Sequence, residues 1–456
     1  MSHSSEKGLL YGLEARIAPL PAFIAALQHV LASMVGIITP PLIIGGVLGL
    51  QAWVPYLISM SLLVSGLGTF LQARRIGGIG AGMICLQGTS FAFLGIILST
   101  GLMLKAQGAS PQQMLAMIFG CNLAAALVPI VVSRCMGVLH KILTPVVTGT
   151  VITLIGISLI KVSMTDWAGG NHAADFGAPA NLALGALTLL VIVALNRSRL
   201  RWARLVAVVA GIGVGCAVAA ITGHAAFKSV AEVPWLALPG FFHFGFAFSW
   251  SLCLPIALVS LISVIEAVGD LTANCMISQQ PISGESFERR LRGGIMADGV
   301  SCILAAVFSA FPNTTFAQNN GVIQMTGVAS RYVGMVIGLL LALLGLFPVI
   351  GAVVQQIPPP VLGGATLVMF GSVVAAGIRV MTQRPLGRRE MLIIAIAFGV
   401  GLGVEAVPDA LKQLPPMIAN LFGHAVTTGG VLAMVLNLLL PGEERPVTVP
   451  QGETQG

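Results

Sequence analysis

The chain has 456 residues, of which 56% are hydrophobic and only 9% charged, with a mean hydropathy of +0.95 and a formal net charge of +7. Soluble domains usually carry about a quarter of charged residues, so this composition excludes a soluble domain and predicts a polytopic membrane protein. The seven cysteines form no CxxC pair and nearly all lie in apolar runs, which argues against metal or disulfide roles.

Apolar segments of spanning length recur along the whole chain. Residues 1–20 lack an apolar core followed by a small-residue cleavage site, so we predict a cytoplasmic tail and no signal peptide. We predict an all-α protein with fourteen transmembrane spans, at 21–48, 53–71, 79–100, 111–133, 142–162, 181–196, 202–222, 250–276, 293–311, 316–330, 332–354, 360–379, 390–407 and 418–440.

The basic residues predict the orientation of these spans. If the N-terminus is cytoplasmic, all of the 23 Lys and Arg residues fall on the cytoplasmic side except Lys105, Lys161, Lys228 and Lys412. This asymmetry follows the positive-inside rule. It predicts that both termini, including the tail 441–456, are cytoplasmic. The basic surplus therefore reflects topology and not nucleic-acid binding.

The longest polar connection, 223–249, divides the spans into two sets of seven. Because seven is odd, the two halves have opposite orientation in the membrane, as in inverted-repeat transporters whose substrate lies near the midplane between interrupted helices. Two stretches provide such interruptions, 87–93 in the third span and 311–321 in the tenth. Their Phe and Thr residues favour extended backbone, which at this depth is tolerated only when buried or lining a cavity.

Two carboxylates occur in the eighth span, where a lipid-facing helix should have none. Glu266 and Asp270 are spaced i, i+4 and so share one helix face. An Asp at the centre of a membrane costs about 2.5 to 3.5 kcal/mol even on lenient scales, so this face must meet a polar interior. We interpret it as part of a substrate or ion site.

These features together suit a planar ligand rich in hydrogen-bonding groups. Phe91 and Phe316 offer flat apolar faces beside the extended segments, and Gln318 and Glu266 could bind the edge of a ring. The alternative is that the amides merely join helices to one another, namely those of Gln87, Gln318, Asn319 and Asn320. That alternative does not explain why corresponding spans of both halves are broken.

The motifs resemble the nucleobase–ascorbate transporter family, also called nucleobase:cation symporter-2. The run Gln318–Gly327 fits its signature, an amide, Asn, any residue and Gly, followed five residues on by Thr. Gln28-His29 fits the family's Gln-His pair, and Ser263–Asp270 is similar to the eighth-span motif of bacterial xanthine permeases. Further likenesses lie at Thr144-Pro145, Ile155–Ile160, Gly293–Gly299, Phe316–Gly334 and Val361–Ala365, so that the resemblance runs from about Pro21 to Pro441.

The resemblance implies two inverted seven-span repeats, with short strands in spans 3 and 10, in a homodimer of the bacterial cytoplasmic (inner) membrane. A core domain would comprise spans 1–4 (21–133) and 8–11 (250–354), and a gate domain spans 5–7 (142–222) and 12–14 (360–440). It implies secondary active uptake of a purine, xanthine above all and urate as a further candidate. A facilitator, channel or anion exchanger of related architecture is the alternative.

The resemblance also assigns substrate contacts. Glu266 would hydrogen-bond the purine, Gln318 would bind its other edge, and Phe91, Phe316 and Ala317 would line the pocket. Asn319 would shape the pocket beside Gln318. Ser90 stands where some xanthine permeases have Asn, and this smaller side chain would leave room near the imidazole edge of the substrate.

For transport, the resemblance requires Asp298, gives Asp270 a supporting role one turn from Glu266, and lets His29 tune affinity or proton coupling. Burial penalises a charged carboxylate, so Glu266 or Asp298 could exchange a proton, and protons are the expected driving ion. Sodium is an alternative, because Asp270, Thr272 and free carbonyls could coordinate it. No cofactor is expected. The chain has no GxxxxGK[ST] stretch, metal-ligand cluster or nucleophile motif, so we predict neither ATP hydrolysis nor an enzyme.

Other polar residues are predicted to have structural or solvated roles. Glu405 and Asp409 are expected in an outer loop that faces water, and His424 is expected to be interfacial or solvated. Asn122 and Asn437 are expected to bridge helices.

Overall fold

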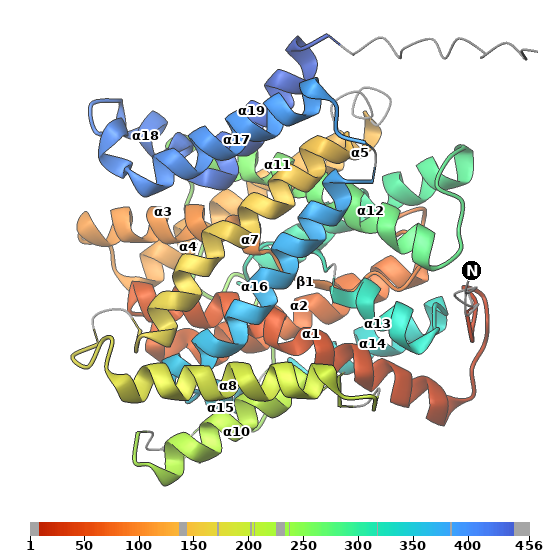
Figure 1. Cartoon of the computed structure of the whole chain (residues 1–456), viewed down its shortest axis with the longest axis horizontal. Coiled ribbons are helices and arrows are strands. Elements are labelled where there is room, and N and C mark those ends of the chain that lie inside the picture. The colour runs from red at the N-terminus through yellow and green to blue at the C-terminus, as the bar shows by residue number, and fades with distance from the viewer. Residues whose placement is uncertain are drawn as a thin grey trace, which may run out of the picture.

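The protein is a bundle of helices of very different lengths around one short sheet near its centre (Figure 1). The structure, a computed structural model, describes residues 9–135, 144–170, 173–200, 203–204, 206–224, 233–236, 238–316, 318–383 and 385–441. The tail 442–456 and residues 1–8 lie outside this part.

The helices of the first half begin at proline in four cases, where the ring fixes a helical φ and no hydrogen bond is lost. They are α1 (Pro19–Leu48), α2 (Val54–Arg74), α3 (Leu94–Ala106), α4 (Pro111–Ala125), α5 (Leu127–Arg134), α7 (Pro145–Trp167), α8 (Pro179–Arg197) and α10 (Ala207–Ile221). Strand β1 (Gln87–Thr89) and the 3-10 turns η1 (Gln51–Trp53) and η2 (Phe91–Phe93) complete this half.

The second half contains more breaks. Its helices are α11 (Trp250–Ile277), α12 (Glu285–Val307), α13 (Gln318–Thr326), α14 (Arg331–Leu344), α15 (Pro348–Val354), α16 (Pro359–Met381), α17 (Arg388–Ala406), α18 (Pro416–Phe422) and α19 (Ala425–Leu439), with strand β2 (Asn313–Thr315) and the 3-10 turn η3 (Pro408–Leu411).

Seven helices of the described residues are long and apolar enough to cross a membrane, and the bent pair α14–α15 would make eight. The fourteen predicted spans include several that the structure builds from shorter pieces. Span 3, predicted at 79–100, has its helix only from Leu94 to Ala106, and span 10, predicted at 316–330, holds only the nine residues of α13. A segment that is only partly helical cannot form a helix of full spanning length, so the number of fourteen stays a prediction.

The predicted span 332–354 is not one straight helix in the structure. The axes of α14 and α15 differ by 81° across a break at residues 345–347. Pro348 begins α15, and a proline within a continuous helix would remove one backbone hydrogen bond and clash with the preceding turn. Hydropathy alone does not register this bend, because the break itself is apolar.

Helices α7 and α16 pack closely along their length. The close approach depends on glycine: a Cβ added to Gly363 would lie 2.2 Å from the backbone nitrogen of Trp167, and one added to Gly156 would lie 2.7 Å from that of Val374. Gly156 and Gly363 both belong to sequence motifs on which the resemblance rests. The structure gives these motif positions a packing role.

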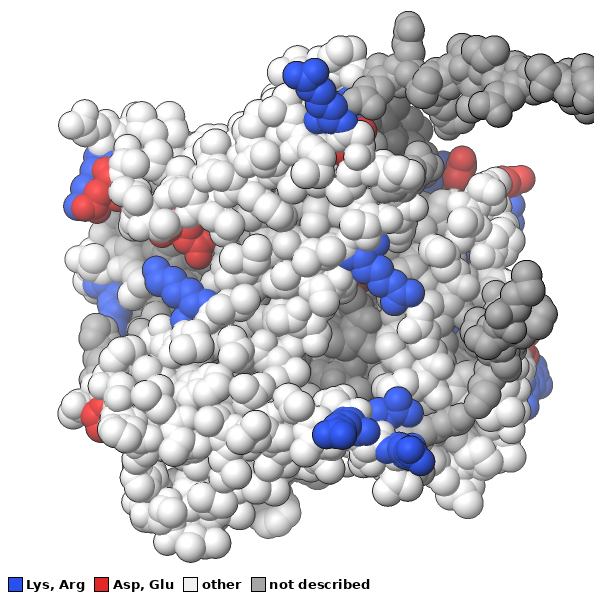
Figure 2. All heavy atoms as spheres, in the orientation of Figure 1, with Lys and Arg blue, Asp and Glu red and all other residues white. Residues whose placement is uncertain are grey.

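The surface agrees with a lipid environment. Large apolar side chains are exposed on helices at the periphery, among them Leu190 of α8, Ile221 of α10 and Leu439 of α19. On the face shown in Figure 2, charged atoms form only isolated groups in a broad field of uncharged residues. A bundle with several apolar spanning helices and such a surface is a multi-pass membrane protein.

Candidate functional site

The two predicted breaks lie side by side at the centre of the molecule. Strands β1 and β2 pair antiparallel, with Gln87 opposite Thr315 and Thr89 opposite Asn313. Backbone hydrogen bonds extend the ladder, from Ser90 N to Pro312 O (2.8 Å) and from Phe316 N to Leu86 O (2.9 Å). The helices α3 and α13 start shortly after these strands, so their N-terminal ends lie near the same centre.

Helix α11 brings the two carboxylates of the eighth span to this centre, and its bounds confirm the predicted span 250–276 within one residue. It contacts both β2 and α13. Asp270 is buried, whereas Glu266 is partly accessible. The Oε2 atom of Glu266 is nevertheless buried and has no hydrogen-bond partner among the described residues. A buried carboxylate oxygen without a donor is costly, so this atom is suited to accept a hydrogen bond from a ligand.

The aromatic residues of the two breaks face each other. The ring centroids of Phe91 and Phe316 are 6.3 Å apart and their planes differ by 18°. A flat ring stacked between them needs about 7 Å, two contacts of about 3.5 Å each. A sandwiched ligand therefore requires these two rings to separate slightly. On its other side, Phe91 meets Phe370 of α16 edge-on at 5.1 Å.

Two glycines provide the surface on which the Phe316 ring rests. A Cβ added to Gly88 of β1 would lie 2.4 Å from a carbon of this ring, and one added to Gly36 of α1 would lie 2.8 Å away. Only hydrogen side chains leave room for the ring at this place. The sequence offered no signal for this role, because the glycines and the ring are far apart along the chain.

Asp298 of α12 is held by amides. Its Oδ1 accepts hydrogen bonds from Gln87 Nε2 (2.7 Å) and Gln72 Nε2 (2.9 Å), and Thr314 and Thr315 of β2 lie against the same carboxylate. Gln72 lies in α2 and also donates to the carbonyl of Gly294. Charge-assisted hydrogen bonds of this kind are about twice as strong as neutral ones. Gln87 thus anchors a carboxylate of another helix. This agrees with the alternative prediction that its amide joins segments of the structure.

The signature run is fixed by its asparagines. Asn319 Nδ2 donates to the carbonyl of Ile84 (2.6 Å), which also accepts from Asn274 of α11 (2.7 Å). Asn320 Nδ2 donates to the backbone carbonyl of Asp270 (3.3 Å). These bonds join the break of span 3, the break of span 10 and α11 into one unit.

The remaining predicted site residues are distributed as follows. His29 is fully buried in α1 and its ring lies beside Asn319. Ser90 is buried at the end of β1, and its hydroxyl has no hydrogen-bond partner among the described residues. Ala317 and the side chain of Gln318 lie outside the described residues, so their predicted roles stay predictions.

Unpaired polar atoms concentrate in this region. Buried oxygens without a partner in the described part of the chain include those of Thr89, Ser90, Glu266, Asp270, Thr314, Thr315 and Asn319. Buried polar groups in folded proteins are nearly always paired, so such a concentration points to a site that binds a polar ligand, protons or water. The described residues include no group of three His, Cys, Asp or Glu side chains that could hold a metal ion.

Sequence reasoning missed Gln72 and Asn274. Both are polar residues in largely apolar helices, and intramembrane polar residues are a general signal for function or helix pairing. The identity of their partners could not be read from the sequence, because Gln72 and Asp298 are 226 positions apart. The expected bridging roles of Asn122 and Asn437 are confirmed, by bonds to Cys302 O and to Thr144 and Arg389 respectively.

Two expectations about water-facing residues are wrong. Glu405 lies within α17, and its Oε2 accepts hydrogen bonds from Ser158 Oγ (2.8 Å) and Ala425 N (3.2 Å). His424 is partly buried, with Nε2 at 3.1 Å from Ser99 Oγ. Both lie where segments of different helices converge, and the sequence order places neither beside its partner. Asp409 is exposed and pairs with Lys412, in agreement with its expected position.

Comparison with known proteins decides the family. A sequence model described as "Permease family" matches residues 21–410. The chain belongs to the nucleobase–ascorbate transporter family. It is 43% identical to xanthine permease XanP of Escherichia coli (98% of this chain, 97% of the relative) and 34% identical to uric acid permease PucJ of Bacillus subtilis (94% and 95%). Such relatives are permeases, so this member of the family is a transporter and not an enzyme.

Two solved structures have a fold similar to that of this chain. The transmembrane domain of the cyanobacterial bicarbonate transporter BicA superposes with a TM-score of 0.55 at 14% identity, covering 94% of this chain and 99% of that one. The murine anion transporter Slc26a9 in its inward-facing state gives a TM-score of 0.61 at 12% identity, covering 93% and 69%. At these identities the likeness concerns the fold alone.

Proposed function

We propose that the chain takes up a purine nucleobase, with xanthine as principal substrate, by proton symport across the cytoplasmic membrane. The observation that carries the proposal is the unpaired buried oxygen of Glu266 on α11, a helix that contacts both broken segments, whose phenylalanine rings are nearly parallel. The names of the xanthine and uric acid permeases add support from close relatives.

In the proposed complex, the purine lies between Phe91 and Phe316 after these rings separate slightly. Glu266 accepts hydrogen bonds from ring N–H groups at one edge, and Gln318 binds the opposite edge. The strands and Ser90 line the remainder. A site built on such polar pairs discriminates strongly, because a mismatched ligand leaves buried groups unpaired. Adenine, hypoxanthine and cytosine present a different donor and acceptor pattern from that of a 2,6-dioxopurine.

Protons are the proposed driving ion. Glu266, Asp270 and Asp298 lie within electrostatic reach of one another at the buried centre. Three like charges in a medium of low dielectric repel strongly, so binding a proton to one of them lowers the energy of the site. Sodium is the competing candidate, with Asp270 and Thr272 as its proposed ligands.

We further propose the fourteen-span inverted repeat with a core of 21–133 and 250–354 and a gate of 142–222 and 360–440. Corresponding segments of the two halves meet in pairs, β1 with β2 and α7 with α16, as a pseudo-twofold arrangement requires. Cytoplasmic termini, the inner-membrane location and the homodimer belong to the same proposal.

The test is uptake of labelled xanthine by intact cells that express the protein, with and without a protonophore. We expect accumulation that the protonophore abolishes and that removal of sodium does not change. Accumulation that depends on sodium would overturn the choice of ion, and absence of xanthine uptake would overturn the substrate. Exchange of bicarbonate or chloride would favour the anion exchanger, which Glu266 disfavours because an unpaired carboxylate repels anions.

The glycine beneath Phe316 leads to one prediction. Gly88→Ala places a methyl group 2.4 Å from the ring and must displace it. Overpacking typically costs about 1–3 kcal/mol, so we expect an increase of about tenfold in the KM for xanthine. Gly371→Ala, where an added Cβ meets nothing within 4 Å, is the matched control. Equal KM values in the two variants would show that the position of Phe316 does not determine affinity.

A second prediction concerns urate, which carries an extra oxygen at position 8. Ser90 is buried with its hydroxyl unpaired, and its side chain is smaller than the Asn that some xanthine permeases have at this place. We expect unlabelled urate to compete with xanthine weakly but detectably. Ser90→Asn should weaken this competition at least fivefold, because the loss of one favourable contact with urate lowers its binding free energy by about 1 kcal/mol. Ser372→Asn on the exposed part of α16 is the control. Failure of urate to compete in large excess would contradict this prediction.

A further inference from the structure

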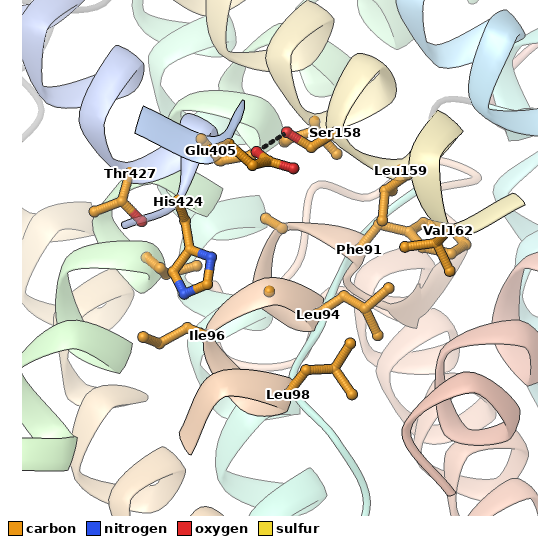
Figure 3. A pocket seen from close by; sticks show the side chains of 15 residues that line it. Phe91, Leu94, Ile96, Leu98, Ser158, Leu159, Val162, Glu405, His424 and Thr427 are labelled. Carbon is orange, nitrogen blue, oxygen red and sulfur yellow. Dashed lines mark hydrogen bonds between the residues drawn. The ribbon is translucent and has the colours of Figure 1, made fainter. Parts of the chain in front are cut away.

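A cavity lies beside the proposed site. It has a volume of about 80 Å³ and lies among η2, α3, α7, α11, α17 and α19. Phe91 forms one wall, so the cavity adjoins the proposed purine site (Figure 3). Glu405, His424 and Thr427 provide polar groups on the side away from Phe91, and apolar residues of α3 and α7 provide most of the remaining wall.

The cavity lies on the boundary between the proposed core and gate. Phe91 and the residues of α3 belong to the core, whereas Ser158, Glu405 and His424 belong to the gate. In the proposed topology, the C-terminal ends of α3, α7 and α17 lie on the outer side of the membrane. The cavity therefore lies between the central site and the outside.

In the part of the chain that the structure describes, one hydrogen bond crosses this boundary. His424 Nε2 lies 3.1 Å from Ser99 Oγ, and so joins the start of α19 to α3. Within the described ranges, the other hydrogen bonds of the core residues stay in the core or go to connecting segments. Apolar contacts such as that of Phe91 with Phe370 allow sliding, but a hydrogen bond has a defined geometry that motion must break.

Glu405 holds His424 in position. Its Oε2 accepts from the hydroxyl of Ser158 in α7 and from the backbone N–H of Ala425, the residue after His424. A single carboxylate oxygen thus joins α7, α17 and the start of α19. Thr428 Oγ1 also donates to Phe422 O across the break between α18 and α19. Gly95 lies next to the imidazole and leaves room for it, because a Cβ added to Gly95 would lie 3.1 Å from His424 Nδ1.

We propose that this cavity is the outer segment of the path by which the purine reaches Glu266, and that the His424–Ser99 hydrogen bond keeps it closed. The proposal rests on the proposed transport function and its topology. Glu405 is a positioning residue, because it acts through His424. Opening requires the bond to break as α3 moves relative to α19, which exposes Phe91 to the outside.

Accessibility of a cysteine in the cavity tests this assignment. Thr427→Cys introduces a thiol of similar size at a buried lining position. Its labelling rate with a membrane-impermeant thiol reagent is measured in intact cells, and the protein without this change provides the background from native cysteines. Adding Ser99→Ala or His424→Ala should raise the rate about fivefold, the effect of losing one net hydrogen bond on an open–closed equilibrium.

Further variants distinguish loss of the His424–Ser99 hydrogen bond from a general disturbance of the fold. Ser99→Ala together with His424→Ala should add little to either single change, because both remove the same bond. His424→Gln retains a donor and should restore part of the low rate. His224 is exposed, and its side chain bonds only to Thr222, at 3.0 Å, among the described residues, so His224→Ala should leave the rate unchanged.

Three results would overturn the proposal. They are unchanged labelling in both single variants, an equal rise in the His224→Ala control, and labelling only from the cytoplasmic side in inverted vesicles. If Thr427→Cys fails to reach the membrane, Leu98→Cys lines the same cavity and replaces it. Failure of the transport proposal is distinguishable, since it would appear as absent xanthine uptake by the unmodified protein, whatever the labelling rates.

Discussion

Glu266→Gln is expected to lower the affinity for xanthine by roughly ten- to hundredfold, with an unchanged amount of protein in the membrane. In the proposed complex the carboxylate accepts hydrogen bonds from ring N–H groups. An amide turns one acceptor into a donor that faces another donor, and hydrogen bonds to charged groups contribute about 1.5–3 kcal/mol. Because Glu266 Oε2 has no partner among the described residues, the change removes no hydrogen bond within the fold at that atom.

The measurement is the concentration dependence of initial xanthine uptake, normalised to the amount of protein in the membrane. Glu285→Gln is the matched control, because Glu285 makes an exposed i, i+4 pair with Arg289 at the start of α12. Exposed ion pairs contribute little to stability, so this control should behave as the unmodified protein. Unaltered affinity in Glu266→Gln would show that the residue has a structural role only.

The sequence was most informative about where helices are interrupted. The polar stretches in spans 3 and 10 indicated broken helices, and the structure places β1 and β2 there. Hydropathy did not reveal the extent of each break. In span 3, Gly80 and Gly82 adopt positive φ, so residues before β1 follow an irregular path that an apolar profile cannot distinguish from a helix.

The sequence predicted those residues of the candidate site that are unusual for their local surroundings. Glu266 and Asp270 stand out because charges are rare in apolar spans, and Phe91 and Phe316 because they flank the breaks. Contacts between distant segments carry no such signal. The pairing of Gln72 with Asp298 and the packing of Phe316 on Gly88 depend on how four segments converge. Glu405 was misassigned for the same reason, since its partners come from α7 and α19.

Asp298→Asn is expected to separate binding from accumulation. Asp298 Oδ1 accepts from Gln72 and Gln87, and the carbonyl oxygen of asparagine can accept the same two bonds. The site should therefore keep its shape and bind xanthine with a Kd within about threefold of normal, a change below 1 kcal/mol. An asparagine cannot exchange a proton, so proton-driven accumulation should fall at least tenfold if Asp298 takes part in coupling.

Two measurements decide this prediction. One is equilibrium binding of labelled xanthine to the purified protein, and the other is accumulation of labelled xanthine in vesicles that contain the protein and have an imposed proton gradient. Asp409→Asn provides the control, because Asp409 is exposed and pairs only with Lys412 among the described residues. Full accumulation by Asp298→Asn would remove this carboxylate from the coupling scheme and leave Glu266 or Asp270 to carry the proton. Loss of both binding and accumulation would instead mean that Gln72 and Gln87 need a charged partner to hold β1 in place. A buried network that loses its charge loses the strongest of its hydrogen bonds.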